Sequence, residues 1–301
     1  MAQKKRIRRI AGDKFNFSHL PFYLYLIPLA VFMGFPIVFI ACHAFKPMDE
    51  LFAFPPQFFV HNPSLVNFRN LLQTAASAMI PMSRYIFNSV IVTGSVVILA
   101  VIFSSMGAFA LSKMEFKGKK VLFEINNAAL MFVPAAVTIP RYLTMDKLGI
   151  INTYFAHILP LLVMPVGLFL IKQFMDQVPD SLIEAAVLDG ASDAGVYFRI
   201  ILPMVKPALA TCAILSFQMV WNNIETSNLF TSTESIRTLA FYMNTLSGGV
   251  LGAAATGQTA ASIPGQGIAA AASLILFIPN LLLFIIMQGN VMNTMAHSGI
   301  K

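Results

Sequence analysis

Long apolar runs separated by short polar segments are the dominant pattern along the chain. The runs at 22–45, 85–111 and 268–287 contain no Asp, Glu, Lys or Arg. About 20 apolar residues are enough for a helix to cross the roughly 30 Å hydrocarbon core of a bilayer. The pattern therefore predicts an all-α integral membrane protein with six transmembrane helices, at residues 22–45, 85–111, 121–140, 154–171, 207–224 and 268–287.

The polar segments divide the chain into unequal parts. Residues 46–84 predict a Pro- and Phe-rich outer loop with one short helix at 65–78. Residues 225–267 are rich in Ser, Thr and Gly and predict a second outer loop, with no structure assigned to 229–267. The predicted organisation is a basic N-terminus at 1–19, the first helix and its loop at 20–84, a core of five helices at 85–291 and a tail at 292–301.

Composition and charge support placement in a lipid bilayer. With 57% hydrophobic and only 11% charged residues, the chain has more apolar surface than one soluble core encloses. The net charge of +7 could indicate nucleic acid, but the basic residues flank apolar runs and match no nucleic-acid-binding motif. If the N-terminus is cytoplasmic, 14 of the 20 Lys and Arg residues lie on that side, as expected because they resist translocation. Both termini and residues 181–207 are thus predicted to be cytoplasmic.

Residues 181–207 are the most tightly patterned polar segment. Ser181 and Glu184 have the spacing of a capping box, which predicts a helix start at Ser181. Gly190 is placed to end this helix in a left-handed conformation. Ser192 or Asp193 can cap a second short helix, expected to end at residues 202–203 because proline disfavours helix at the residue before it. The prediction is a helix, a turn and a second helix outside the lipid.

Two interpretations of this segment are open on physical grounds. It fits an ordinary interfacial connector between two spans. It also fits a docking surface for another protein, because Ala185, Ala186 and Gly190 allow close approach beside the charges of Glu184 and Asp189.

The segment also resembles the signature loop of binding-protein-dependent ABC importer permeases. That signature reads E-A-A, three residues, G, nine residues, I-x-L-P, and every fixed position is matched by Glu184-Ala185-Ala186, Gly190 and Ile200-Ile201-Leu202-Pro203. Asp189 before the glycine looks like the carbohydrate-uptake branch of the family. The resemblance implies a multi-pass protein of a bacterial or archaeal plasma membrane, the transmembrane subunit of an ATP-driven importer that moves a carbohydrate into the cytoplasm.

The resemblance also implies partners and residue roles. The loop at 176–207, between the fourth and fifth helices, would insert a coupling helix into a groove of a cytoplasmic ATPase dimer, which carries the ATP and Mg. A second homologous permease subunit and an extracytoplasmic solute-binding protein complete the transporter. Roles would follow by position: Glu184 as a charged contact, Ala185 and Ala186 as the close-packed surface, Asp189 and Gly190 at the turn, and Ile200, Leu202 and Pro203 as anchors of the second helix.

The sequence contains no recognisable motif for nucleotide binding, catalysis or metal binding. No G-x-x-x-x-G-K-[ST] phosphate loop, H-E-x-x-H pair or Cys/His cluster occurs. We therefore expect no catalytic residues, no metal and no cofactor bound by this chain. Two other classes are weaker: an ion-coupled secondary transporter of a small polar solute predicts charges in the apolar spans, and a membrane-embedded enzyme needs a catalytic motif.

The fifth apolar run carries the candidate substrate-path residues. Gln218, Asn222 and Glu225 recur at helical spacing with Trp221 beside them. Amides bond sugar hydroxyls, and an aromatic face can stack on a sugar ring. The alternative is hydrogen bonding between helices, with Trp221 as an interface anchor.

Overall fold

The computed structural model describes residues 20–298 except 52, 78–79 and 256–258. The described residues form helices and their connections, without a strand. Three helices are long and apolar enough to cross a membrane, or up to five if each of two bent helix pairs counts as one span. The all-helical fold with membrane-spanning helices is thereby confirmed. The predicted number of six spans is not reached when helices are judged by length and apolar composition.

The first span and its loop follow the prediction closely. α1 (Leu20–Phe45) is one helix despite two internal prolines, and α2 (Met48–Leu51) is short. α3 (Val66–Ser77) confirms the helix expected at 65–78. The buried Asn67 ties α3 to α1, because its amide donates to the carbonyls of Ala44 and Lys46 at 3.0 and 2.8 Å. These bonds satisfy carbonyls at the helix end, where no intrahelical partner exists.

The second span is confirmed as α4 (Met82–Lys113), but a continuous third helix at 121–140 is wrong. α5 (Lys119–Ala129) ends early, and a short 3₁₀ turn, η2 (Pro134–Val137), leads into α6 (Thr138–Lys147). Val133 is extended, at φ −74° and ψ 126°, because the ring of the following proline disfavours the α conformation there.

The fourth span is bent rather than straight. α7 (Tyr154–Leu162) and α8 (Pro165–Asp176) meet at an angle of 43°. Pro165 starts the second helix, where its missing N–H costs no intrahelical bond. The fifth span, α12 (Lys206–Trp221), is followed by the short α13 (Glu225–Leu229) and the 3₁₀ turn η4 (Glu234–Ile236).

The expected outer loop at 225–267 is largely helical. α14 (Leu239–Ala255) occupies its middle, and α15 (Thr259–Ser298) begins within it and continues through the sixth predicted span. The Ser, Thr and Gly content suggested a loop, but α14 packs against α15 and α4. Burial of Leu239, Phe241, Tyr242 and Met243 stabilises the helix more than local propensity opposes it.

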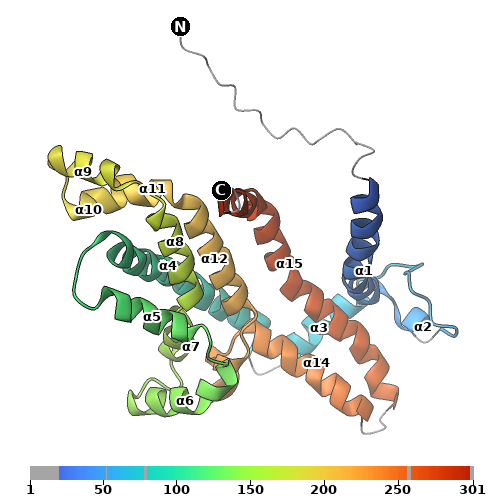
Figure 1. Ribbon diagram of the computed structural model, residues 1–301. Coiled ribbons are helices and arrows are strands. Elements are labelled where there is room, and N and C mark those ends of the chain that lie inside the picture. Colours follow the sequence, from blue (N-terminus) through green and yellow to red (C-terminus); the bar gives the residue numbers. More distant parts are fainter. Residues whose placement is uncertain (1–19, 52, 78–79, 256–258, 299–301) are drawn as a thin grey trace.

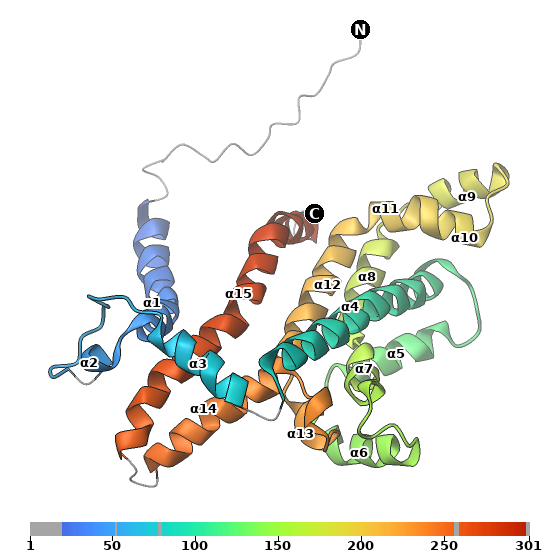
Figure 2. The ribbon, with the colours of Figure 1, turned by 180° about the vertical axis from the view of Figure 1, so that it is seen from behind.

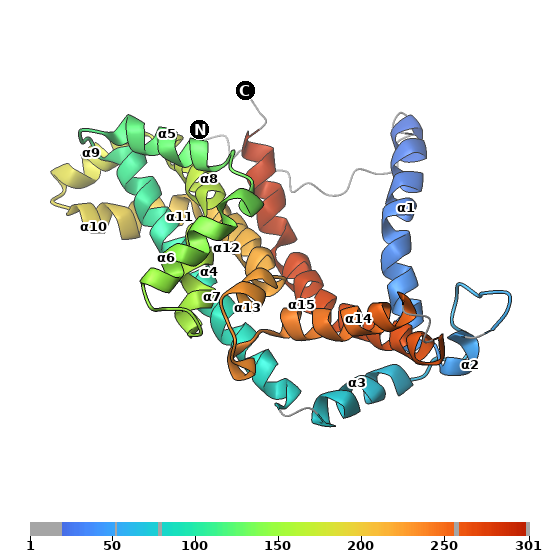
Figure 3. The same cartoon turned by 90° about the horizontal axis from the view of Figure 1, so that it is seen from below.

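The helices form two packed groups. α4, α7, α8 and α12 pack together, and α15 joins α12 to α14, α3 and α1. The start of α1, the segment from α9 to α11 and the end of α15 lie toward one end of the molecule, with α6, the end of α14 and the start of α15 toward the opposite end (Figures 1 and 2). Seen from below, α1 and α9–α10 lie at opposite sides, with α12, α14 and α15 between them (Figure 3).

Candidate functional site

The segment between α8 and α12 has the predicted helix–turn–helix form. α9 (Asp180–Leu188) is followed by Gly190 at φ +83°, a left-handed conformation that residues with a Cβ rarely adopt. α10 (Asp193–Val196) then begins with the Ser192 hydroxyl accepting from the Gly195 amide at 3.3 Å. The glycine turn and the Ser192 cap are therefore confirmed.

Two details of the predicted segment are wrong. The capping box does not form, because Pro179 is the N-cap residue and Ser181 lies inside the helix without capping it. Glu184 is then five residues after the N-cap, beyond the three-residue spacing that a capping box requires. The second helix does not stop at Leu202. It passes through a π-helical turn, η3 (Tyr197–Ile201), into α11 (Leu202–Met204), and this wider turn accommodates a proline that lacks an N–H.

The outer surface of this segment is small, charged and partly apolar. Glu184, Ala185, Asp189 and Gly190 are exposed, and Ala186 is half-buried. Sequence reasoning missed two large apolar side chains on the same surface: Leu188 is 88% and Phe198 is 64% exposed. A groove of about 780 Å³ runs between α9 and α10, with Ala186, Asp189, Gly190 and Phe198 in its lining.

The inner surface is held by side chains that the motif did not point to. Val196, Tyr197, Ile201 and Val205 are buried, whereas Ile200 and Leu202 are only half-buried and Pro203 is exposed. Val196, Ile201 and Val205 belong to one buried cluster with Ile171, Met175 and Cys212 of α8 and α12. The four-residue spacing of Tyr197, Ile201 and Val205 could have indicated this face, since such residues share one side of a helix.

The end of α4 holds the segment at three places. The Lys113 ammonium, with a side chain 6% exposed, donates to the Val178 carbonyl and to Asp180 Oδ1, both at 2.7 Å. The Ser112 hydroxyl donates to Asp176 Oδ1 at 2.6 Å, next to the start of α9. The start of α9 is thus bonded directly to the last turn of α4.

The third attachment of α4 is to η3. The hydroxyl oxygens of Ser105 and Tyr197 are 2.7 Å apart and buried, and the Phe109 ring packs on Tyr197 with ring centroids 5.2 Å apart. Both helices of the segment are therefore bound to one span.

Lys113 also changes the acidity of its partner. Its hydrogen bond and positive charge hold the pKa of Asp180 below its ordinary value of 3.8. A carboxyl with a lowered folded pKa contributes stability above its unfolded pKa and loses it only as pH falls through the folded value. The ion pair is therefore fully formed throughout the neutral and mildly acidic range.

The four candidate substrate-path residues do not all face the same environment. Gln218 and Asn222 are exposed. Trp221 is 8% exposed, stacks on Phe217 and donates from Nε1 to the Leu276 carbonyl at 3.2 Å. Glu225 is half-buried and pairs with Arg141 at 3.2 Å. Gln218 and Asn222 are therefore accessible, whereas Trp221 and Glu225 are engaged in contacts within the chain.

Comparison with known proteins identifies the family. Residues 17–291 match the family model described as "binding-protein-dependent transport system inner membrane component". The chain belongs to this family. It is 34% identical over 219 residues to the probable ABC transporter permease protein YurM of Bacillus subtilis, covering 72% of this chain and 69% of YurM.

Further relatives agree with this membership. The arabinooligosaccharides transport system permease protein AraQ of Halalkalibacterium halodurans is 31% identical over 218 residues, covering 70% of this chain and 77% of AraQ. A crystal structure of a bacterial ABC transporter involved in the import of the acidic polysaccharide alginate matches with a TM-score of 0.76 at 20% identity, over 92% of this chain and 98% of that one. At this identity the structural match shows a shared fold.

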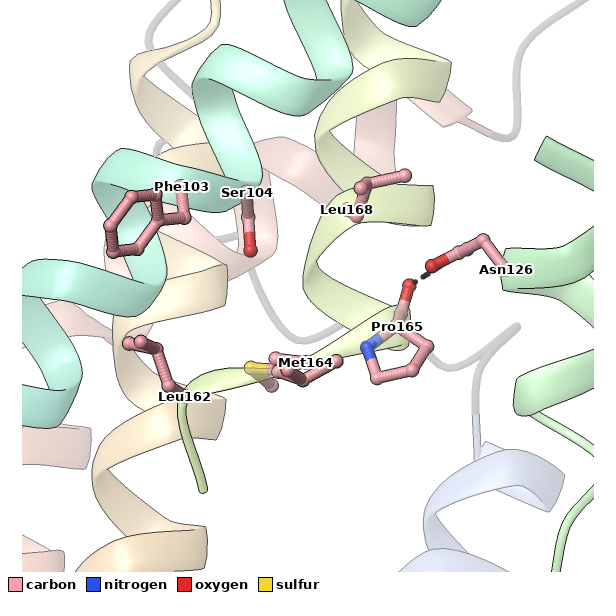
Figure 4. A pocket seen from close by; sticks show the side chains of 8 residues that line it. Phe103, Ser104, Asn126, Leu162, Met164, Pro165 and Leu168 are labelled. Carbon is pink, nitrogen blue, oxygen red and sulfur yellow. Dashed lines mark hydrogen bonds between the residues drawn. The ribbon is translucent and has the colours of Figure 1, made fainter. Parts of the chain in front are cut away.

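In this inner-membrane component, the break between α7 and α8 opens a small pocket. Its volume is about 300 Å³, and Phe103, Ser104, Met164 and Leu168 are among its lining residues (Figure 4). The Asn126 amide of α5 donates to the Pro165 carbonyl at 3.3 Å. This bond attaches the shortened α5 to the start of α8.

Another asparagine of this component is used structurally. The buried Asn88 amide donates to the carbonyls of Ser235 and Arg237 at 2.9 and 2.8 Å, and its oxygen accepts from the Tyr154 hydroxyl at 2.7 Å. These bonds fasten the η4 connection to α4 and use both N–H groups of Asn88, so that only one acceptor site remains on its buried amide oxygen.

Proposed function

We propose that this chain is the transmembrane subunit of an ATP-driven ABC importer that moves a carbohydrate into the cytoplasm. The observation that carries the proposal is the segment at 176–207. It is a helix–turn–helix in which Glu184, Ala185 and Gly190 are exposed, with the 88% exposed Leu188 beside them. An exposed large apolar side chain next to small residues suits insertion into a groove of a partner protein.

A carbohydrate cargo is supported by the relatives. AraQ is named for arabinooligosaccharide transport, and the alginate transporter imports a polysaccharide. The family membership speaks against the ion-coupled secondary transporter, because binding-protein-dependent systems of this kind take energy from a separate ATPase.

The proposal includes a six-span topology with both termini and the segment 176–207 in the cytoplasm. α5 with the η2 turn forms the third span, broken at Pro134. Support comes from the excess of Lys and Arg on this side and from the position of α9–α11 toward the same end as the start of α1 and the end of α15.

The complete transporter, in this proposal, has four kinds of component. A second homologous permease pairs with this chain, an ATPase dimer binds the cytoplasmic segment, and an extracytoplasmic protein delivers the solute. ATP and Mg are bound by the ATPase, and this chain catalyses no reaction itself. A neighbour of similar fold was solved in complex with an alginate pentasaccharide-bound periplasmic protein, which supports the delivery step.

Proteoliposomes containing the complete transporter test the energy source. Uptake of labelled sugar is expected to require ATP and to survive a proton uncoupler. Uptake that requires a proton gradient and is independent of ATP would contradict the proposal and indicate a secondary transporter.

The role of the cytoplasmic segment is tested by Glu184→Lys combined with Gly190→Pro. Proline cannot adopt the positive φ of Gly190, so the turn is lost together with a surface charge, and ATP-driven uptake is expected to fall at least about 100-fold. Glu115→Lys, a charge reversal on the 92% exposed Glu115 side chain of another loop, is the control and is expected to retain uptake. Equal uptake by both variants, at equal membrane insertion, would contradict the assignment.

A further inference from the structure

A cavity of about 310 Å³ lies at the end of α12 that is farther from the segment 176–207. α14 begins near this end of α12 and runs antiparallel to α15 (Figures 1 and 3). The lining comes from α14, α15 and the residues just after α12: Asn222, Ile224, Ala240, Met243, Asn244, Ser273 and Leu276. Its volume is at the lower end of the range for small-ligand pockets.

Three polar side chains from three different parts of the fold face this cavity. Asn222 follows α12, Asn244 belongs to α14 and Ser273 to α15. All three are exposed. The residues are 22 and 29 positions apart along the chain, so their convergence results from the packing of α14 and α15 rather than from a local motif.

The Asn222 amide is held in a fixed orientation. Its oxygen accepts from the Asn280 amide at 3.2 Å, and its nitrogen donates to the Gln218 carbonyl at 2.9 Å. An amide oxygen has two lone pairs and an NH₂ group has two hydrogens. One acceptor site and one donor site of Asn222 therefore remain for a ligand.

Asn244 and Ser273 differ from the structural asparagines of this chain. Within the part of the chain that the structure describes, neither side chain forms a hydrogen bond with the protein. Asn67 and Asn88, by contrast, bind backbone carbonyls and join helices or loops. A structural role in holding helices together therefore explains Asn222 and Asn280 but leaves the polar groups of Asn244 and Ser273 unused.

The rest of the cavity wall is apolar, and buried side chains pack behind it. Its apolar part is formed by Ile224, Ala240, Met243 and Leu276. The carbonyl of Leu276 accepts a hydrogen bond from the Trp221 indole, which is stacked on Phe217. Trp221 does not line the cavity but holds Leu276, one of the lining residues, in place. A sugar ring presents hydroxyls at its edge and C–H groups on its face, which matches amides and a hydroxyl beside an apolar wall.

The lack of charged side chains in the cavity lining favours an uncharged ligand. Within the part of the chain that the structure describes, no Asp, Glu, Lys or Arg lines the cavity, and the Glu225 carboxylate near it is paired with Arg141 at 3.2 Å. A carboxylate placed in this cavity would lose its hydration without gaining a cation, which is costly. An uncharged polyol loses only hydroxyl–water bonds that the amides can replace.

We propose that Asn222, Asn244 and Ser273 form a binding subsite for one neutral sugar unit, so that this subunit contacts the transported carbohydrate directly. The inference rests on the proposed import function and deepens it. It predicts preference for neutral oligosaccharides over uronic acid oligomers at the membrane step.

The test uses proteoliposomes with the complete transporter and saturating binding protein, with radiolabelled maltotriose, raffinose and arabinotriose as probes and trigalacturonate as the acidic competitor. The variant Asn244→Ala with Ser273→Ala is expected to lower uptake of the imported sugar about tenfold, the effect of losing two neutral hydrogen bonds. ATP hydrolysis stimulated by the binding protein is expected to stay within about twofold of the unmodified transporter, because the cytoplasmic segment is untouched. Ser273→Thr keeps the hydroxyl and is expected to retain uptake.

The matched control is Asn228→Ala with Ser232→Ala, which removes the same groups at exposed positions outside the cavity. Uptake by the cavity variant equal to that of the control would overturn the inference while leaving the proposed function intact. A parallel loss of ATP hydrolysis and uptake would also overturn it, because it would indicate a structural role. If the unmodified transporter imports none of these sugars in an ATP-dependent way, the proposed import function itself is contradicted. Effective competition by trigalacturonate would contradict the preference for neutral sugars.

Discussion

At the residue scale, the clearest constraint on side-chain size is where α15 passes α3. A Cβ added to Gly267 would lie 2.5 Å from Asn67 Oδ1 and 2.7 Å from its Cγ and Nδ2. Asn67 has no room to move, since it is fully buried and its amide donates to the carbonyls of Ala44 in α1 and of Lys46 just after it. The absence of a side chain at 267 therefore allows three helices to meet.

Gly267→Ala is expected to lower the free energy of unfolding by about 1–3 kcal/mol, the usual cost of overpacking, and to weaken the attachment of α1. The measurement is the thermal unfolding midpoint of the purified protein in detergent. Gly94→Ala is the control: a Cβ at Gly94 of α4 would meet nothing within 4 Å, and alanine is the better helix former, so its midpoint should not fall. Equal midpoints for both variants would contradict the packing argument.

At the scale of elements, α4 is the span whose side chains bond the segment 176–207 at several places. Lys113 binds the start of α9, Ser112 binds Asp176, and Ser105 meets Tyr197 of η3. Contacts at both α9 and η3 mean that a displacement of the segment displaces the end of α4 as well. α4 is therefore the element expected to carry movement of this segment into the membrane.

Lys113→Met removes the bonds to Val178 and Asp180 while keeping the aliphatic part of the side chain. We expect ATP hydrolysis to continue but the sugar imported per ATP hydrolysed to fall by a factor of about three or more, a scale set by losing one ion pair and one carbonyl bond. Lys117→Met, at an exposed lysine of the connection that follows α4, should leave the ratio unchanged. Because the pKa of Asp180 is lowered, the unmodified transporter should keep the same ratio at pH 5 and pH 7; a drop confined to the interval from 7 to 5 would show that another group controls coupling.

At the scale of the whole molecule, the helical ends divide between two sides. The segment from α9 to α11 lies toward one end of the bundle, and α6 lies toward the other (Figure 1). The proposed topology places the first of these ends in the cytoplasm. This assignment makes opposite predictions for two exposed positions, Leu188 in α9 and Asn228 in α13.

Cysteine labelling tests that topology. In a chain with Cys42 and Cys212 replaced by alanine, Leu188→Cys should react with a membrane-impermeant maleimide in inside-out vesicles and be protected in intact cells stripped of any outer wall. Asn228→Cys should show the reverse pattern. Reaction of both from the same side would rule out the proposed arrangement.

Much of this protein could be predicted from local patterns. The helical membrane fold, the short helix at 65–78, the turn at Gly190 and the Ser192 cap depend on apolar run length or on one residue's backbone preference, and both are properties of a few neighbouring positions. Predictions from local patterns were wrong where a proline opposed the helix or the cap that the neighbouring residues favoured. Pro134 interrupts the apolar run at 121–140, and Pro179 displaces the capping box at Ser181.

The sequence by itself determined that this chain crosses a membrane and exposes an E-A-A segment with a glycine turn, because hydrophobic run length and motif spacing are read along the chain. Only the tertiary structure decided that residues 239–255 are helical, that Lys113 binds Asp180, and that Asn222, Asn244 and Ser273 line one cavity. Each of these depends on residues that are distant in sequence and become neighbours only when the helices pack, and packing energy outweighs the weak local preferences that a sequence pattern records.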